Sequence, residues 1–270
     1  MPLVAALLVP GSPLHFLRRE LAPYASLVQA HAEAAQTLAA AQADVLVVYS
    51  TQWIAVLDEL WQLRAHVQGL HVDENWYEHG DLPFSLHIDT ELTRACIDAT
   101  PAIGVRSKGV DYDGFPVDSG TIVASGLLDP SGKLPLVLAA NNVYHDWART
   151  AQLGAVVAAQ AQALGRRYAV VGVGALSGAA FRHEIDLAHD ELHSPAEDAL
   201  NRRFLDTLAA GDGARLRAEC PAFAAQARAD MGMKHLAFVL GALGANYRGG
   251  RTLGYGPAYG SGAAVFQFHC

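Results

Sequence analysis

The chain has 270 residues and a formal net charge of -8 at pH 7, with 19 basic side chains spread thinly along it. This excludes nucleic acid as the main partner, and no apolar run approaches the roughly 18 residues that a membrane-spanning helix needs. The cysteines Cys96, Cys220 and Cys270 form no Cys-x-x-Cys pair, and the apolar start of the chain lacks the basic region of an export signal. We therefore expect a globular, cytoplasmic protein.

The beginning of the chain has the pattern of a strand, a helix and a second strand. Residues 3–9 form a continuous apolar run, as in strands that are covered on both faces. The pair Ser12-Pro13 suits the cap and first turn of a helix, which we predict to continue to about Ala41. A second apolar run, residues 45–49, ends in Ser50-Thr51-Gln52-Trp53. This opening is typical of a parallel sheet.

The rest of the chain continues the alternation of strands and helices. The segment Ser194-Pro195-Ala196-Glu197 has the capping-box pattern that begins a helix. We expect one α/β domain over residues 1–270, with a mostly parallel sheet flanked by helices. The further predictions are loops at 70–83 and 114–121, strands at 134–140 and 168–174, helices at 90–99, 150–164, 195–209 and 234–243, and a Gly- and Tyr-rich tail at 247–261.

Ligands of such sheets bind outside the carboxyl ends of the strands. The informative segments are therefore the loops that follow strands: Pro10-Gly11-Ser12, Ser50 to Trp53, Asn141 to His145, and Gly174 to Gly178. His15, just inside the first helix, is the histidine that we expect nearest to this edge. One histidine cannot build a catalytic metal centre, which takes about three protein ligands.

For several motifs we favour a structural interpretation over a functional one. The glycines of residues 172–178 are out of register for a dinucleotide fingerprint, and the Ser-Gly-Lys sequence ending at Lys133 lacks the spacing of a phosphate loop. Ser177 lacks the flanking glycines of a nucleophile elbow. The polar group His183, Glu184, His189, Glu191 and His193 matches no metal signature, so solvated loop and helix ends are its simpler interpretation.

Motifs along nearly the whole chain together resemble the class III extradiol dioxygenases. They are the first strand with its Pro10 turn, residues 47–53, Pro116-Val117-Asp118-Ser119-Gly120-Thr121, residues 170–178, and Gly241-Ala242-Leu243. The resemblance implies the fold of that family and its Fe(II) chemistry, in which two histidines and one glutamate hold the metal and leave positions open for O₂ and an aromatic substrate.

The resemblance also shows which functional positions have changed. The two ligand histidines correspond to Gly11 and Gln52, the pocket histidine to Ser119 and the acid–base histidine to Gly178. No acidic residue lies between Met231 and Leu243, so Asp230 is the nearby candidate for the carboxylate. We therefore expect no catalytic and no metal-binding residue in this chain. The remaining pocket is predicted to consist of His15, Gln52, Trp53, Ser119, Tyr144 and Ser177.

Two-component members of this family, the 2-aminophenol 1,6-dioxygenases, pair an iron-bearing β subunit with a similar α subunit without iron. The chain resembles such an α subunit, which implies a homologous β partner, an α₂β₂ assembly and no cofactor of its own. Two alternatives stay open. One is an enzyme with a relocated site at His15, His145 or the late polar group. The other is a stand-alone binding protein for aromatic molecules, with Trp53 as a stacking wall.

Overall fold

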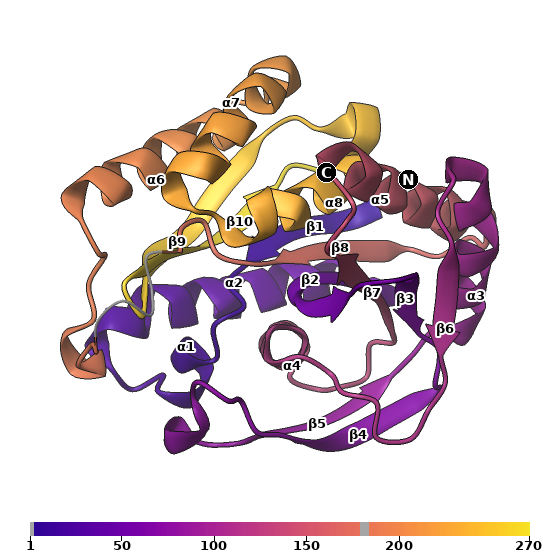
Figure 1. The fold of residues 1–270 in the computed structure, drawn as a ribbon, viewed down its shortest axis with the longest axis horizontal. Helices are drawn as coiled ribbons and strands as arrows, with labels where there is room; N and C mark the ends of the chain where they lie inside the picture. Colours follow the sequence, from indigo (N-terminus) through magenta and orange to yellow (C-terminus); the bar gives the residue numbers. More distant parts are fainter. Residues whose placement is uncertain (1–2, 179–183) are drawn as a thin grey trace.

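Four buried parallel strands form the centre of the structure. The computed structural model describes residues 3–178 and 184–270. The central strands are β1 (Leu3–Val9), β2 (Val45–Ala55), β7 (Leu136–Asn142) and β8 (Tyr168–Val173), and they lie in the order β7-β2-β8-β1. Each begins as an apolar run because helices cover both faces of the sheet (Figure 1). The predicted first, second and late strands are therefore confirmed.

Further strands on both sides extend the sheet to eight, in the order β6-β3-β7-β2-β8-β1-β10-β9. On one side β3 (Glu59–Gln62) pairs antiparallel with β7 and parallel with β6 (Ser107–Val110). On the other, β10 (Ser261–Phe268) pairs antiparallel with β1 and with β9 (Gly250–Ala258). A separate hairpin consists of β4 (His66–His71) and β5 (Leu82–His87). The predicted α/β class with a mostly parallel sheet is confirmed.

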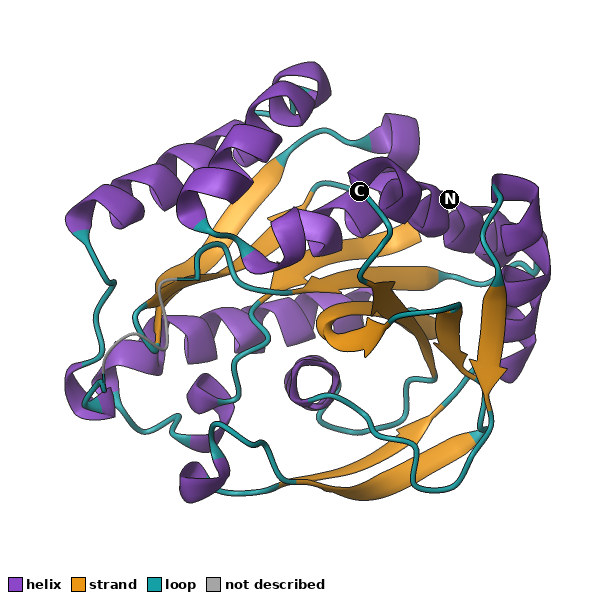
Figure 2. Cartoon of the chain, in the orientation of Figure 1, coloured by secondary structure: helices purple, strands orange, loops and turns teal. Residues whose placement is uncertain are grey.

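Helices and the hairpin form a layer on each face of the sheet (Figures 1 and 2). Residues of α2 (Ala25–Ala41), α4 (Ser119–Leu128) and the β4–β5 hairpin share one hydrophobic cluster with one face. The other cluster joins the opposite face to α3 (Thr90–Ala99), α5 (Trp147–Ala163), α6 (Pro195–Ala209), α7 (Gly213–Ala227) and α8 (Lys234–Leu243). In the described residues no helix is long and apolar enough to cross a membrane.

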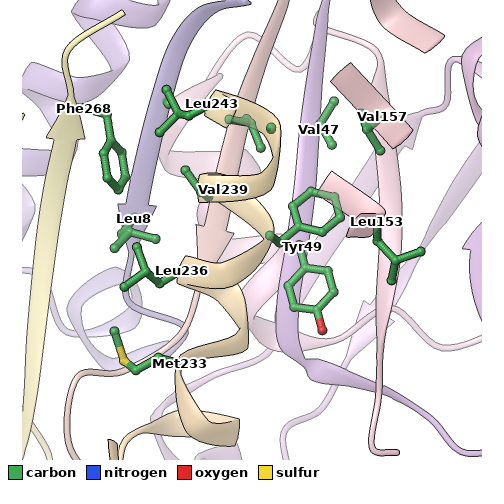
Figure 3. Close-up of a cluster of buried hydrophobic side chains, with 14 of the residues drawn as sticks. Leu8, Val47, Tyr49, Leu153, Val157, Met233, Leu236, Val239, Leu243 and Phe268 are labelled. Carbon is green, nitrogen blue, oxygen red and sulfur yellow. The ribbon is translucent and has the colours of Figure 1, made fainter. Parts of the chain in front are cut away.

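Helix α8 packs beside α5 on the sheet, where Leu236 and Val239 lie near Leu8 (Figure 3). The ring of Phe238 stacks on that of Tyr49 from β2, with ring centroids 4.7 Å apart. A Cβ atom at Gly241 would lie 1.9 Å from the carbonyl oxygen of Ala151 on α5. The glycine of the Gly-Ala-Leu motif therefore permits the close approach of two helices, and the motif is a packing feature.

The structure corrects four sequence predictions. The helix expected from Pro13 to Ala41 is interrupted: α1 spans only Leu14–Leu17, and a 3₁₀ turn at Ala22–Tyr24 precedes α2, because Pro23 supplies no N–H to an uninterrupted helix. The tail at 247–261 largely forms β9 and the turn to β10. The loop at 70–83 includes the ends of β4 and β5, and that at 114–121 includes the start of α4.

The limits of several helices agree closely with the prediction. Helices α3 and α8 have the expected limits, and the Ser194 side chain accepts a hydrogen bond from the Glu197 N–H at the start of α6. Helix α5 begins three residues earlier than expected, at Trp147, where Asp146 caps it. Helix α7 was not predicted.

Candidate functional site

Helix α4 begins at the carboxyl edge of the sheet, directly beside the end of β2. Its cap is Asp118, whose carboxylate accepts hydrogen bonds from the Thr121 N–H (2.9 Å) and the Thr121 hydroxyl (2.5 Å). The Ser50 hydroxyl of β2 donates to the same carboxylate at 2.5 Å. Asp118 is thus a helix cap that also ties the helix to the strand.

Gln52 links this helix start to the first strand-end turn. Its Oε1 accepts hydrogen bonds from the Ser119 hydroxyl (3.0 Å) and the Gly120 N–H (2.7 Å). Its Nε2 donates to the carbonyl oxygen of Gly11 at 3.2 Å. Both ends of the amide are therefore engaged, and the predicted site positions Gly11, Gln52 and Ser119 meet in one cross-link, which we call the Gln52 bridge.

The glycine at position 11 makes room for this bridge. A Cβ atom there would lie 2.9 Å from the Gln52 Nε2 and 3.2 Å from its Cδ. Any larger side chain at Gly11 must therefore displace the Gln52 amide. The glycine at position 11 and the glutamine at position 52 are therefore sterically matched to each other.

Asp230, the candidate for the family carboxylate, also lies at this edge. One of its carboxylate oxygens accepts hydrogen bonds from the Thr51 hydroxyl (3.1 Å) and the Ala175 N–H (3.2 Å). Burial raises the pKa of Asp230 above its ordinary value, against the opposing effect of these two hydrogen bonds. The side chain thereby connects the ends of β2 and β8.

The late strand-end loop packs against the rest of the protein. The N–H of Gly178 donates to the Ala227 carbonyl oxygen at 3.1 Å, and a Cβ atom at Gly178 would lie 2.5 Å from the Arg228 carbonyl oxygen. The Ser177 hydroxyl is fully buried and accepts hydrogen bonds from the Asn201 amide (3.0 Å) and the Gly262 N–H (2.7 Å). Ser177 therefore connects this loop to α6 and β10.

The other predicted pocket residues, His15, Trp53 and Tyr144, do not take part in the Gln52 bridge. His15 is fully buried and its ring stacks on that of His31, with centroids 4.8 Å apart. Burial, followed by the proximity of His31, holds the pKa of His15 well below its usual range. Trp53 is buried and meets Phe115 edge-on at 6.4 Å. Tyr144 lies on the surface with 79% of its area exposed, so the structure does not bring it together with the buried members.

Sequence reasoning missed a buried polar group beneath the ends of β2 and β7. Glu59 of β3 is fully buried, and its Oε2 lies 3.3 Å from the His145 Nδ1. Burial raises the pKa of Glu59 to about 7. The Lys234 ammonium donates to the Asn142 carbonyl oxygen at 2.8 Å, and burial lowers the pKa of Lys234. The Tyr49 hydroxyl adds a hydrogen bond to Asn141. The acidic pair Asp58-Glu59 amid apolar residues was the available signal.

The side chains present do not fit a three-ligand metal centre. Within residues 3–178 and 184–270, no three or more His, Cys, Asp or Glu side chains are grouped so that they could hold a metal ion. Glycine offers no side-chain ligand, and the oxygen of the Gln52 amide already accepts two hydrogen bonds. In the late polar group, His183 lies outside the described residues, and the exposed His189 pairs with Asp186 at 2.8 Å.

The sequence and the fold place the protein in the family of aromatic ring-opening dioxygenase subunits. Residues 18–266 match the family described as the catalytic LigB subunit of aromatic ring-opening dioxygenase, and the chain belongs to that family. A crystal structure of an uncharacterized protein from Escherichia coli K12 has the same fold, with a TM-score of 0.69, 13% identity, and coverage of 98% of this chain and 100% of that one.

Among curated relatives, the chain is similar to both subunits of one enzyme. It is 44% identical over 269 residues to the 2-aminophenol 1,6-dioxygenase alpha subunit of a Pseudomonas species, which covers 99% of each chain. It is 31% identical over 100 residues to the beta subunit from Pseudomonas, which covers 37% of this chain and 33% of the relative. The alpha-type relative therefore matches along the whole chain, and the beta-type relative along about a third of it.

Proposed function

We propose that this chain is the non-catalytic α subunit of a two-component, Fe(II)-dependent dioxygenase of the 2-aminophenol 1,6-dioxygenase type. In this proposal the iron resides in a homologous β subunit, which opens the aromatic ring with O₂, and the two subunits assemble as α₂β₂ in the cytoplasm. Residues 1–270 act as one domain that supports the catalytic partner. The full-length similarity to an alpha subunit supports this assignment, and the partial similarity to a beta subunit supports a homologous partner.

The Gln52 bridge is the observation that carries the proposal. A facial Fe(II) site takes two imidazoles and a carboxylate. Here the first imidazole position is a glycine, and the second is an amide that hydrogen bonds already hold at both ends. Asp230 alone remains, and it is engaged by Thr51 and Ala175. A neutral amide oxygen is a weak substitute for an imidazole at Fe(II).

The side chains that would transfer protons are also missing from the site. A general acid or base must come within hydrogen-bond reach of the reacting group. Ser119 stands at the pocket-histidine position and donates its hydroxyl to Gln52. Glycine stands at the acid–base position, where the Arg228 carbonyl oxygen leaves no room for a Cβ atom. Metal ligands and proton relay are therefore changed together, which favours a supporting role.

The two alternatives receive less support. A relocated site would need side chains that are available to a substrate, but the His145 imidazole is paired with the buried Glu59 and His15 is stacked on His31. A stand-alone binding protein for aromatic molecules would use Trp53, whose indole is buried against Phe115. Titration with 2-aminophenol should accordingly leave the tryptophan fluorescence of the isolated chain unchanged.

The test is to express this chain and candidate iron-bearing subunits separately and together. The chain alone is expected to bind no stoichiometric Fe(II) and to leave 2-aminophenol intact, whereas the complex should elute as α₂β₂ and open the ring. Stoichiometric iron and ring cleavage by the chain alone would refute the proposal. The Asp230→Asn variant is a second check, because it should leave the iron content of the complex unchanged if all the iron belongs to the partner.

A further inference from the structure

Glu59 of β3 carries a buried carboxyl group that no hydrogen bond holds. The residue has no solvent exposure, and within residues 3–178 and 184–270 neither of its carboxyl oxygens has a hydrogen-bond partner. The Nδ1 atom of His145 lies 3.3 Å from its Oε2, but no hydrogen bond joins the two atoms. Because an unpartnered carboxylate is costly to bury, this position favours the protonated carboxyl group.

A buried ammonium group lies near this carboxyl group and is bonded to the backbone instead. Lys234, the first residue of α8, is 8% exposed. Its ammonium donates to the carbonyl oxygens of Asn142 (2.8 Å) and Val143 (3.3 Å). These carbonyls belong to the end of β7 and to residues 143–146, which lead into α5 and which we call the β7 turn. Lys234 therefore fixes the start of the β7 turn.

The charges of the two groups act on each other. Burial raises the pKa of Glu59 to about 7, and first His145 and then Lys234 oppose this rise. Burial lowers the pKa of Lys234, and first Glu59 and then Asp146 oppose this fall. Loss of the Glu59 proton thus favours the charged form of Lys234, so the ammonium remains when the carboxylate forms.

Apart from His145, the other titratable groups around Glu59 do not exchange protons near neutral pH. On the side of β2, burial and then Glu59 raise the pKa of the Tyr49 hydroxyl above its ordinary value. On the side of α3, burial raises the pKa of the Cys96 thiol to about 12. The charges on the side of β6 are already paired: Arg106 and Lys108 with Asp58. His145, whose side chain is 17% exposed, gives the buried carboxyl group its contact with solvent.

Ionisation of Glu59 changes which partner suits the ammonium. A hydrogen bond between two charged groups is stronger than one to a neutral carbonyl oxygen. The lysine stem is long and flexible, so the ammonium can turn from the backbone to a neighbouring carboxylate. The carboxylate in turn needs a cation, because an unpaired buried charge is strongly unfavourable. The neutral and ionised forms of Glu59 therefore favour two different positions of the Lys234 ammonium.

We propose that Glu59 and Lys234 form a proton-operated switch of the β7 turn. While Glu59 is protonated, the Lys234 ammonium holds the carbonyl oxygens of Asn142 and Val143. When Glu59 releases its proton to solvent past His145, the ammonium moves to the carboxylate and the β7 turn becomes mobile. One proton leaves and no covalent bond within the chain's backbone changes. The switch needs neither iron nor a partner subunit, so it goes beyond the proposed function and makes the order of this edge of the sheet depend on pH.

Nuclear magnetic resonance of the full chain at about pH 6 and about pH 8 tests the switch. The backbone order parameters of residues 143–145 should fall from about 0.85, the value of rigid backbone, to below about 0.6. Those of Val170 and Val171 in β8 should stay at about 0.85, which separates motion of the β7 turn from loss of the fold. The carboxyl signal of Glu59 should titrate with a midpoint of about 7, together with the fall in order.

Two variants fix the switch in opposite states. Glu59→Gln replaces the carboxyl group by a neutral amide of similar shape, and the β7 turn should stay ordered at both pH values. Lys234→Met removes the ammonium, and the turn should be mobile at both. Glu74→Gln changes an exposed glutamate outside the site and should keep the wild-type response. Circular dichroism verifies folding, and the wild type and Glu59→Gln suffice for the test where Lys234→Met does not fold.

Equal order of the β7 turn at the two pH values in the wild type would overturn the proposal. A fall in order that persists in Glu59→Gln would do the same, since the released proton would then come from another group. So would a Glu59 carboxyl signal that titrates near its ordinary value of 4.5, because the carboxylate would then coexist with the bonded β7 turn at neutral pH. These results are independent of the iron content and ring cleavage that test the proposed function.

Discussion

Replacement of Gln52 by alanine tests whether the Gln52 bridge stabilises the strand-end region. The substitution removes three hydrogen bonds: two accepted from Ser119 and Gly120, and one donated to the Gly11 carbonyl oxygen. A typical intramolecular hydrogen bond contributes about 1 kcal/mol net, which sets an upper figure of about 3 kcal/mol. Because Gln52 is partly exposed, water will replace some of these partners, so we expect a loss of about 2 kcal/mol in the free energy of unfolding.

Urea denaturation monitored by tryptophan fluorescence measures this loss, and the melting temperature should fall by roughly 4–8 °C for a chain of this length. Gln68 on β4 is an exposed glutamine away from the bridge, and Gln68→Ala should change the unfolding free energy by less than about 0.5 kcal/mol. Equal effects of the two substitutions would refute the assigned role of Gln52.

Three further predictions concern other positions. Gly11→Ala should destabilise the wild-type chain more than it destabilises the Gln52→Ala variant, because the new Cβ atom meets only the Gln52 amide at close range. Additive effects of the two substitutions on the free energy of unfolding would contradict this prediction. Gly178→Ala should lower the free energy of unfolding by more than about 2 kcal/mol, because the new Cβ atom would collide with the Arg228 carbonyl oxygen. Thermal denaturation measures this loss, and an unchanged melting temperature would disprove the contact. Burial raises the pKa of Glu59 from 4.5 to about 7, so between these pH values the folded chain keeps a proton that the unfolded chain has released. The free energy of unfolding therefore falls as the pH rises from about 4.5 to 7. Glu59→Gln should reduce this fall by on the order of 3 kcal/mol in urea titrations, and an unaltered pH profile would contradict the prediction.

The central strands and several helices could be predicted because each has a local cause. A continuous apolar run such as residues 168–173 can be stable only when both faces are covered, and Ser194 with Glu197 places the start of α6 in the sequence itself. The pairing of β10 with β1 has no such local signal. The Gly- and Tyr-rich composition of the tail hid an edge hairpin that forms through tertiary contacts.

The sequence indicated that some of the candidate positions lie together, but it did not indicate their contacts. Strand ends of a parallel sheet lie at one edge, so Gly11 and Gln52 were expected near each other. The partner of Gln52 on α4 was not foreseen, because residues 114–121 were interpreted as a loop from their glycine and proline content. The signal was Asp118, followed three residues later by Thr121, whose N–H it caps.

The Gln52 bridge explains how a strand-end site can lose its ligands and keep its shape. In the proposed function, iron and its histidines no longer connect the first and second strand-end turns of this chain. The Gln52 amide makes that connection from Gly11 to the start of α4, and Asp230 connects the ends of β2 and β8. The hydrogen bonds of these two side chains therefore hold the carboxyl edge of the sheet together. Under the proposed function, the exchange of metal ligands for hydrogen-bonding side chains preserves the arrangement of these strand ends.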